Sequence, residues 1–128
     1  MSGSDELLAA ALAVRANAYA PYSNFAVGAA VRSASGRIFA GTNVENASYP
    51  VGTCAEAGAI AAMIAAGERR IVEVLVLGEG TRPLTPCGAC RQRLAEFAGA
   101  DALVHAADPR GIRASYSLGA LLPEAFGL

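Results

Sequence analysis

Residues 54–77 of the chain are CAEAGAIAAMIAAGERRIVEVLVL, and two patterns within them decide the fold. Between residues 54 and 66 nearly every position is Ala, Ile or Met, which predicts a helix that is buried on most faces and ends at Gly67. Residues 71–77 are almost continuously β-branched or leucine, which is typical of a strand covered on both faces. A buried helix followed at once by such a strand indicates an α/β fold.

The pattern of helix and strand continues toward the C-terminus. Residues 87–97 follow Pro86 and predict another helix, ended at Gly99. Short apolar runs then predict strands at residues 102–107 and 112–117, followed by a turn at residues 118–122.

The N-terminal part predicts one helix and one hairpin. Leucines at helical spacing indicate a helix over residues 5–20, capped by Ser4 or Asp5 and stopped by Pro21. Two apolar runs, residues 25–32 and 37–42, flank a small polar turn and predict a β-hairpin. The alternation predicts a single domain, residues 1–128, with a three-layer α/β/α sandwich and a five-stranded mixed sheet.

The composition restricts the partners of the protein. Charged residues are 16% and hydrophobic residues 54%, so a lone monomer has an unusually apolar surface and self-association is expected. The net charge of −1 and the absence of a basic tract argue against a nucleic-acid partner. No apolar run is long enough for a membrane span and residues 1–6 lack the basic region of a signal peptide, so we expect a cytosolic protein.

The three cysteines form the most informative pattern. Cys87 and Cys90 are three residues apart at the start of a predicted helix, so their thiolates lie one turn apart on one face. Cys54 supplies a third sulfur, and it can share a site with Glu56 only if it sits at the junction of a loop and a helix. Helix starts stabilise thiolates through their free N–H groups.

Three sulfur ligands leave one tetrahedral position of zinc open, which is typical of a catalytic site. Zinc lowers the pKa of a bound water from about 16 to about 7, and a carboxylate that is not a ligand can move the proton of that water. Glu56 is the candidate for that role. Taken alone, however, a Cys-x-x-Cys pair is shared by zinc knuckles, redox motifs and chance sequences.

The chain resembles the small zinc-dependent cytidine deaminases along nearly its whole length. Cys-Ala-Glu about thirty residues before Pro-Cys-x-x-Cys matches the zinc-deaminase signature, with Cys in place of the usual His. The other matching stretches are YAPYS (19–23), FAVGAA (25–30), NVEN (43–46) and LLPEAF (121–126). The resemblance implies hydrolytic deamination of cytidine and deoxycytidine in pyrimidine salvage, with one zinc ion held by Cys54, Cys87 and Cys90 and with Glu56 as the catalytic acid and base.

The resemblance also implies the substrate-binding residues. Phe25 packs near the pyrimidine, Asn43 and Glu45 hold the ribose 3′-hydroxyl, and the backbone around Cys54, including Ala55, contacts the base. Residues 47–49, with Tyr49, and Phe126 complete the pocket of a neighbouring subunit in a homotetramer. From the residues alone, the favoured interpretation of Phe25 is a core phenylalanine, and that of the cluster at Asn43 and Glu45 is a solvated turn.

The chain departs from the family in one place. Many members have Arg directly after the catalytic glutamate, where it offsets thiolate charge, but this chain has Ala57. We therefore expect Arg91, next to Cys90, to hydrogen-bond a zinc thiolate.

Two other functions fit parts of the sequence. A deaminase of another aminopyrimidine nucleoside, such as blasticidin S, would share the zinc motif, although Asn43 and Glu45 favour cytidine. A zinc-stabilised interaction module would need a fourth ligand, and His105 is the one histidine of the sequence. His105 lies in a predicted strand away from both motifs and is expected to be a sheet residue.

Overall fold

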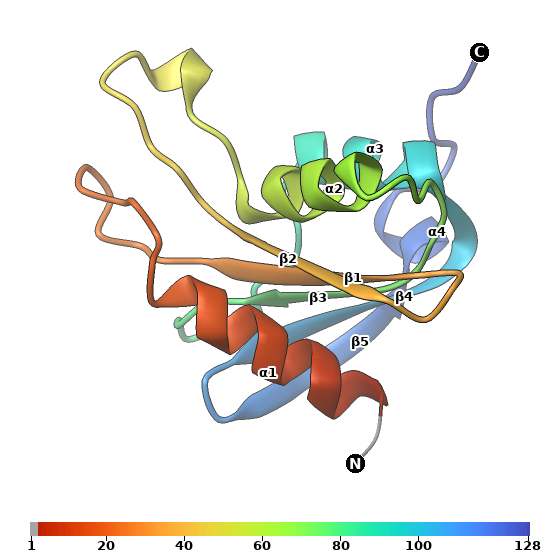
Figure 1. Cartoon of the computed structure of the whole chain (residues 1–128), viewed down its shortest axis with the longest axis horizontal. Coiled ribbons are helices and arrows are strands. Elements are labelled where there is room, and N and C mark those ends of the chain that lie inside the picture. Colours follow the sequence, from red (N-terminus) through yellow and green to blue (C-terminus); the bar gives the residue numbers. More distant parts are fainter. Residues whose placement is uncertain (1–2) are drawn as a thin grey trace.

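A five-stranded mixed sheet forms the middle layer of the computed structural model, which describes residues 3–128 (Figure 1). The strands are β1 (Gly28–Ser33), β2 (Ile38–Thr42), β3 (Ile71–Leu77), β4 (Ala98–Asp108) and β5 (Gly111–Ser117). They lie in the order β2-β1-β3-β4-β5. β3 and β4 are parallel, and the other neighbouring pairs are antiparallel. The predicted mixed sheet is therefore confirmed.

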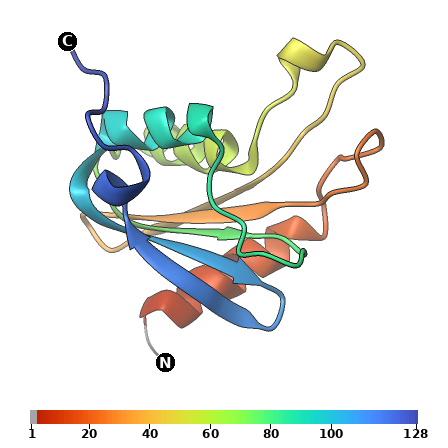
Figure 2. The same cartoon turned by 180° about the vertical axis from the view of Figure 1, so that it is seen from behind.

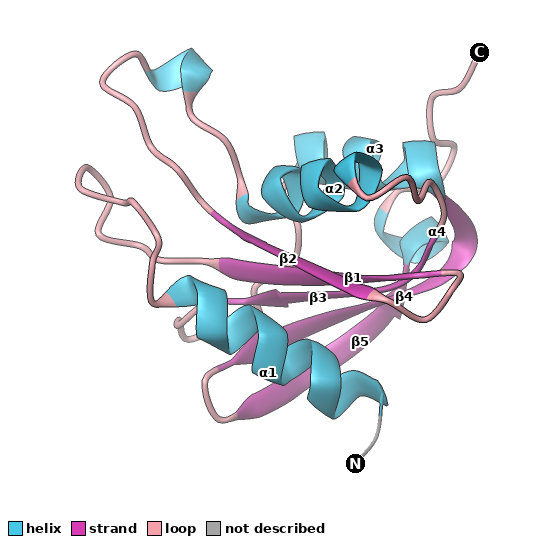
Figure 3. Ribbon diagram, in the orientation of Figure 1, coloured by secondary structure: helices cyan, strands magenta, loops and turns pink. Residues whose placement is uncertain are grey.

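Helices cover both faces of the sheet. The helix α1 (Gly3–Arg15) lies on one face, and α2 (Ala55–Ala65), α3 (Gly88–Phe97) and the short α4 (Leu118–Leu121) lie on the other (Figure 3). This arrangement confirms the predicted three-layer sandwich. Within residues 3–128, no helix has both the length and the apolar composition needed to cross a bilayer.

β3 separates two apolar cores, as its uniform hydrophobicity predicts. Leu75 and Leu77 pack with Leu7 of α1 on one face of the sheet. Val74 and Val76 pack with Met63 of α2 on the other face. Because successive side chains of a strand point to opposite faces, a strand buried on both sides has to be apolar at nearly every position.

The N-terminal elements are shorter than the sequence predicts. α1 ends at Arg15 instead of residue 20, because the chain then pairs with the segment after β2: Tyr19 N–H donates to Asn43 O (3.1 Å) and Glu45 N–H donates to Tyr19 O (2.8 Å). Ser4 and Asp5 lie inside the first turn of α1 and are not its cap. β1 begins at Gly28 instead of residue 25. In the C-terminal half, by contrast, β4 is longer than predicted, since it begins at Ala98, four residues before the predicted start.

Two long loops project from the same end of the sheet (Figures 1 and 2). One joins α1 to β1 and the other joins β2 to α2 and contains the short 3₁₀ helix Tyr49–Val51. The second loop leads into a helix that is docked tightly against β2. A Cβ atom on Gly41 would lie 2.3 Å from Ala59 N and 2.6 Å from Ala55 O, so the absence of a side chain at Gly41 sets how closely α2 approaches the sheet.

Candidate metal centre and active site

Three cysteine sulfurs meet where α2 and α3 begin. Cys54 and Cys87 are the N-cap residues of the two helices, and Cys90 lies in the first turn of α3. Their sulfur atoms all lie within 4.8 Å of one another, and Cys54 Sγ is 3.8 Å from Cys87 Sγ. A tetrahedral ion with Zn–S bonds of about 2.3 Å keeps its sulfur ligands about 3.8 Å apart. The donor set therefore fits zinc, and Cys54 occupies the loop-to-helix junction that the sequence requires.

The electrostatics of the thiols also indicate a cation site. Burial raises the pKa of the Cys54 thiol, and burial together with the Glu56 carboxylate and the other thiols raises that of Cys90. Burial acts in the same direction on Cys87. Hydrogen bonds with the backbone of Cys90 and with the side chains of Cys90 and Cys54 outweigh burial, however, and lower the pKa of the Cys87 thiol. Three thiolates so close together need a positive ion to stay charged at neutral pH.

Glu56 lies beside the cluster and is not one of its ligands. It is the second residue of α2, its side chain lines a cavity of about 640 Å³, and the residue is only 3% exposed. Burial raises the pKa of its carboxyl group, against the opposing effects of hydrogen bonds and of Arg93. A carboxyl whose pKa is moved toward neutrality is suited to accepting and returning protons.

The cavity lies between the two projecting loops and the starts of the helices, and it brings most of the predicted site residues together. The predicted residues that line it are Cys54, Cys87, Glu56, Phe25, Asn43, Glu45, Tyr49 and Ala55. Cys90 is fully buried, and Phe126 does not line the cavity. Tyr22, Ser23, Leu84 and Thr85 also line it, although no sequence pattern singled them out as site residues.

Asn43 and Glu45 share one task in the structure, which is to hold the loop before β1. Asn43 accepts a hydrogen bond at Oδ1 from Val27 N–H (2.9 Å) and donates one from Nδ2 to Phe25 O (2.8 Å). Glu45 accepts hydrogen bonds from the backbone N–H groups of Tyr22 and Ser23 and from the Ser23 hydroxyl. The two polar side chains thus fix the backbone that presents Phe25 to the cavity.

Tyr49 and Phe126 are strongly exposed, at 76% and 72%. The Tyr49 ring meets the Tyr22 ring edge to face, with centroids 6.0 Å apart. Phe126 contributes its carbonyl oxygen as acceptor for Gln92 Nε2 (3.0 Å), while the ring stands free of the cavity of its own chain.

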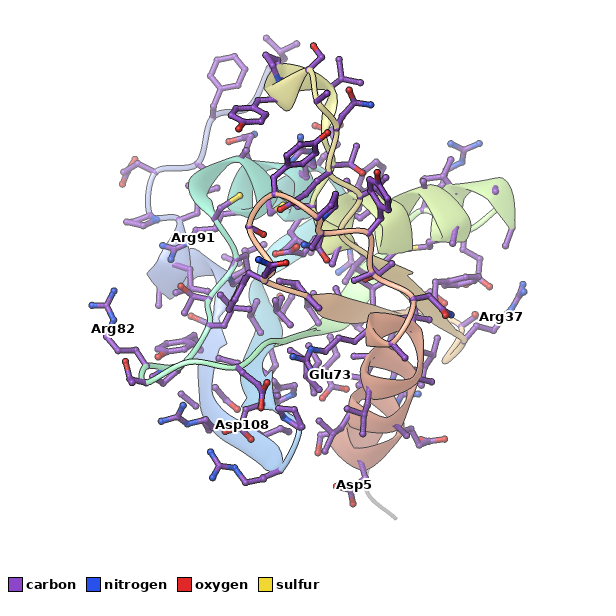
Figure 4. The ribbon with its side chains drawn as sticks, turned by 90° about the vertical axis from the view of Figure 1, so that its left-hand side faces the viewer. Asp5, Arg37, Glu73, Arg82, Arg91 and Asp108 are labelled. Atoms are coloured by element: carbon purple, nitrogen blue, oxygen red, sulfur yellow. The ribbon has the colours of Figure 1, made fainter. Side chains whose placement is uncertain are left out.

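The expectation that Arg91 contacts a thiolate is wrong. Its guanidinium donates to Pro86 O (2.8 Å), Leu121 O (2.8 Å) and Thr85 Oγ1 (3.0 Å), so it ties the segment before Cys87 to α4. Figure 4 shows Arg91 at the start of α3. The arginine that reaches the cluster is Arg93, whose Nη1 donates to Cys90 Sγ over 3.3 Å. The three-residue spacing from Cys90 is the signal that could have identified it.

His105 is a sheet residue, as expected. It is buried in β4, with Nε2 2.6 Å from Glu73 Oε2 and Nδ1 2.7 Å from Ser115 Oγ. Among residues 3–128, the cluster that could hold a metal contains the three cysteines and no histidine.

Comparison with known proteins identifies the family. Residues 1–106 match the family model of the cytidine and deoxycytidylate deaminase zinc-binding region. A cytidine deaminase of Halalkalibacterium halodurans is 41% identical over 120 residues, which are 94% of this chain and 91% of that protein. A cytidine deaminase of Mycobacterium tuberculosis is 44% identical over 114 residues, 88% of this chain and 81% of that protein.

Solved structures agree with the sequence matches. The crystal structure of a cytidine deaminase from Burkholderia pseudomallei superposes with a TM-score of 0.90 at 44% identity, covering 98% of this chain and all of that one. The crystal structure of a cytidine deaminase from Mycobacterium tuberculosis superposes with a TM-score of 0.83 at 41% identity, covering 97% of each chain. With the same fold, the zinc-binding region and the thiol cluster in place, the chain belongs to the cytidine and deoxycytidylate deaminase family.

Proposed function

We propose that this protein is a cytidine deaminase that hydrolyses the exocyclic amine of cytidine and deoxycytidine, giving uridine or deoxyuridine and ammonia, in pyrimidine salvage. The observation that carries the proposal is the buried Glu56 carboxyl in a cavity whose wall also contains two of the three clustered thiols. Membership of the deaminase family gives this arrangement its chemical meaning.

Cys54, Cys87 and Cys90 would hold one zinc ion, which supplies a polarised water of lowered pKa when bound. Glu56 takes the two protons of the attacking water in turn and delivers one to the ring nitrogen N3 and the other to the departing amine. The water oxygen becomes the carbonyl oxygen at C4, and the amine leaves as ammonia. The raised pKa of Glu56 suits a group that alternates between base and acid.

The substrate is held from both loops of the cavity. Phe25 packs near the pyrimidine, the backbone at Ala55 contacts the base, and Glu56 reaches its amide edge, since all three residues line the cavity. Asn43 and Glu45 hold the ribose 3′-hydroxyl. They use the hydrogen-bond donors and acceptors that remain after they have formed hydrogen bonds to the loop before β1.

The two alternative functions are tested by different features. A zinc-stabilised interaction module needs a fourth protein ligand. Both ring nitrogens of His105 lie within hydrogen-bonding distance of Glu73 and Ser115, which argues against His105 as that ligand. A deaminase of blasticidin S shares the thiol cluster and Glu56, and it has to be separated by substrate.

The direct test is a deamination assay in which ultraviolet absorbance monitors the reaction. The compounds to be tested are cytidine, deoxycytidine, cytosine, CMP, adenosine and blasticidin S. We expect turnover of the two free cytosine nucleosides alone. Turnover confined to blasticidin S would replace the proposal by its closest alternative, and a zinc-loaded protein inactive on all six compounds would overturn it.

We further propose a homotetramer in which neighbouring subunits complete each pocket. The large exposed apolar side chains that support it gather on the two projecting loops and the C-terminal segment: Tyr19, Tyr22, Val44, Tyr49, Val51 and Phe126. Apolar groups concentrated in this way are usually covered by a partner.

A cytosolic location also stays a prediction, based on three free thiols that have to remain reduced to bind metal.

A further inference from the structure

A guanidinium reaches the thiol cluster from outside the substrate cavity. Arg93 Nη1 donates to Cys90 Sγ over 3.3 Å, and the two residues lie one turn apart on α3. Among the arginines that the structure describes, Arg93 is the one with a hydrogen bond to a ligand sulfur.

The charge of the site makes this contact important. Three thiolates carry −3 and zinc carries +2, so the loaded cluster has a net charge of −1, and Cys90 within it is fully buried. The N-termini of α2 and α3 each contribute roughly half a positive charge. A hydrogen bond from a guanidinium to a thiolate is charge-assisted and adds a full positive charge next to the sulfur with the least access to water.

Arg93 lies close to the alanine that follows Glu56. Arg93 lines a shallow groove on the outer side of α2 and α3, which we call the outer groove: Ala57, Ile60, Ala61, Gln92, Arg93, Glu96 and Phe97. Ala57 and Arg93 share this groove, and neither lines the substrate cavity. A long side chain at position 57 would therefore lie in the space next to Arg93.

We propose that Arg93 is a positioning residue of the metal site, which orients the Cys90 thiolate, withdraws electron density from it, and supplies from α3 the positive charge that Ala57 does not supply from α2. This inference rests on the proposed function, since it assigns Arg93 a part in the zinc site of that deaminase. The guanidinium does not line the substrate cavity, so it does not touch the substrate and acts on the reaction through the Cys90 sulfur and through its charge near Glu56.

The test compares zinc-loaded wild type with Arg93→Gln, which removes the charge and keeps most of the side-chain stem. We expect zinc to pass to a chromogenic chelator roughly 10-fold faster, the effect typical of losing a partner of a metal ligand. In the cobalt-substituted protein the sulfur-to-metal charge-transfer band should move to longer wavelength, because the unbonded thiolate donates more strongly. We expect kcat to fall and KM for cytidine to change less than twofold.

Two further variants separate charge from structure. Arg93→Lys keeps a cation and should lie between wild type and Arg93→Gln in both metal readouts. Ala57→Arg added to Arg93→Gln places a guanidinium in the outer groove from α2 and should restore slow zinc release and the position of the cobalt band. Arg69→Gln removes an exposed arginine elsewhere and is the matched control.

Unchanged zinc release and an unchanged cobalt band in Arg93→Gln would overturn the inference, as would equal changes in Arg69→Gln. Failure of the proposed function looks different: zinc release would still depend on Arg93, but the wild-type protein would deaminate none of the nucleosides.

Discussion

Among single residues, Glu56 is the one on which the proposed chemistry depends most. Glu56→Ala should keep zinc and fold, because the three thiol ligands remain, and should lower kcat at least about 10³-fold, near the upper range for loss of a general acid and base. Metal content and kcat have to be measured on the same sample. Glu56→Gln is the control of equal size, and activity above a tenth of wild type in either variant would remove Glu56 from its role.

At this scale the sequence predicted the thiol ligands and Glu56 because zinc accepts few residue types and the helix spacing is local. Arg93 obeys the same spacing rule but was missed, since a helix arginine is usually a solvated residue. The hydrogen bonds of Asn43 and Glu45 to residues 22–27 were out of reach for another reason: they join segments about twenty residues apart, and no local pattern specifies such a contact.

The contact between β2 and α2 controls the element that carries Cys54 and Glu56. Gly41→Ala would place a methyl 2.3 Å from Ala59 N and should cost about 1–3 kcal/mol of unfolding free energy, since backbone has to move. It should also weaken zinc binding, because α2 is displaced. Urea unfolding and zinc titration measure both effects.

Gly58→Ala is the matched control on the helix side of the same contact. Its added methyl meets Gly41 Cα at 3.4 Å, an ordinary contact, and replacing a helix glycine by alanine gains about 0.5–1 kcal/mol. If both variants lose stability equally, the close approach at Gly41 is not what sets the position of α2.

The turn of the β1–β2 hairpin is tied to the segment after α2 by a carboxylate. Glu68 accepts hydrogen bonds from the hydroxyls of Ser33 and Ser35, which hold its pKa below the ordinary 4.5. The pKa is lowered in the folded protein, so the stabilisation is present above about pH 4.5 and is lost as the pH falls through the folded pKa. The stability difference between wild type and Glu68→Gln should therefore be constant near neutrality and shrink in acid.

Urea unfolding at a series of pH values measures this difference. Asp108 provides the comparison, because hydrogen bonds from Arg110 lower its pKa as well and Asp108→Asn should show the same sign. A difference that grows toward acid pH would contradict the assignment for Glu68.

The bounds of an element were predicted best where burial on all sides requires apolar residues along nearly its whole length. β3 has the predicted bounds, since both of its faces are covered. The end of α1 was predicted five residues too late, because its helical spacing continues to Tyr19 while the backbone of Tyr19 pairs with Asn43 and Glu45. Helix propensity is a weak preference that tertiary hydrogen bonds override.

The whole molecule is expected to assemble. Light scattering should give roughly four times the 12.9 kDa chain mass at assay concentration, because the exposed apolar groups on the loops and the C-terminal segment need a partner surface. Tyr49→Ser should weaken assembly and raise KM together if the pocket is shared between subunits. A wild-type monomer with full activity would contradict the homotetramer.

The placement of the tyrosines has a practical consequence for watching the protein at work. The sequence has no tryptophan and four tyrosines, so its near-ultraviolet emission comes from tyrosine. Tyr22 and Tyr49 line the cavity, and Tyr19 is 55% exposed on the same loop as Tyr22. Occupation of the cavity or burial of the loops by another subunit should change this intrinsic fluorescence without any added dye. A stopped-flow experiment with a slowly reacting cytidine analogue could therefore follow both events in the unlabelled protein, with Tyr49→Phe identifying the share of the signal that comes from the cavity mouth.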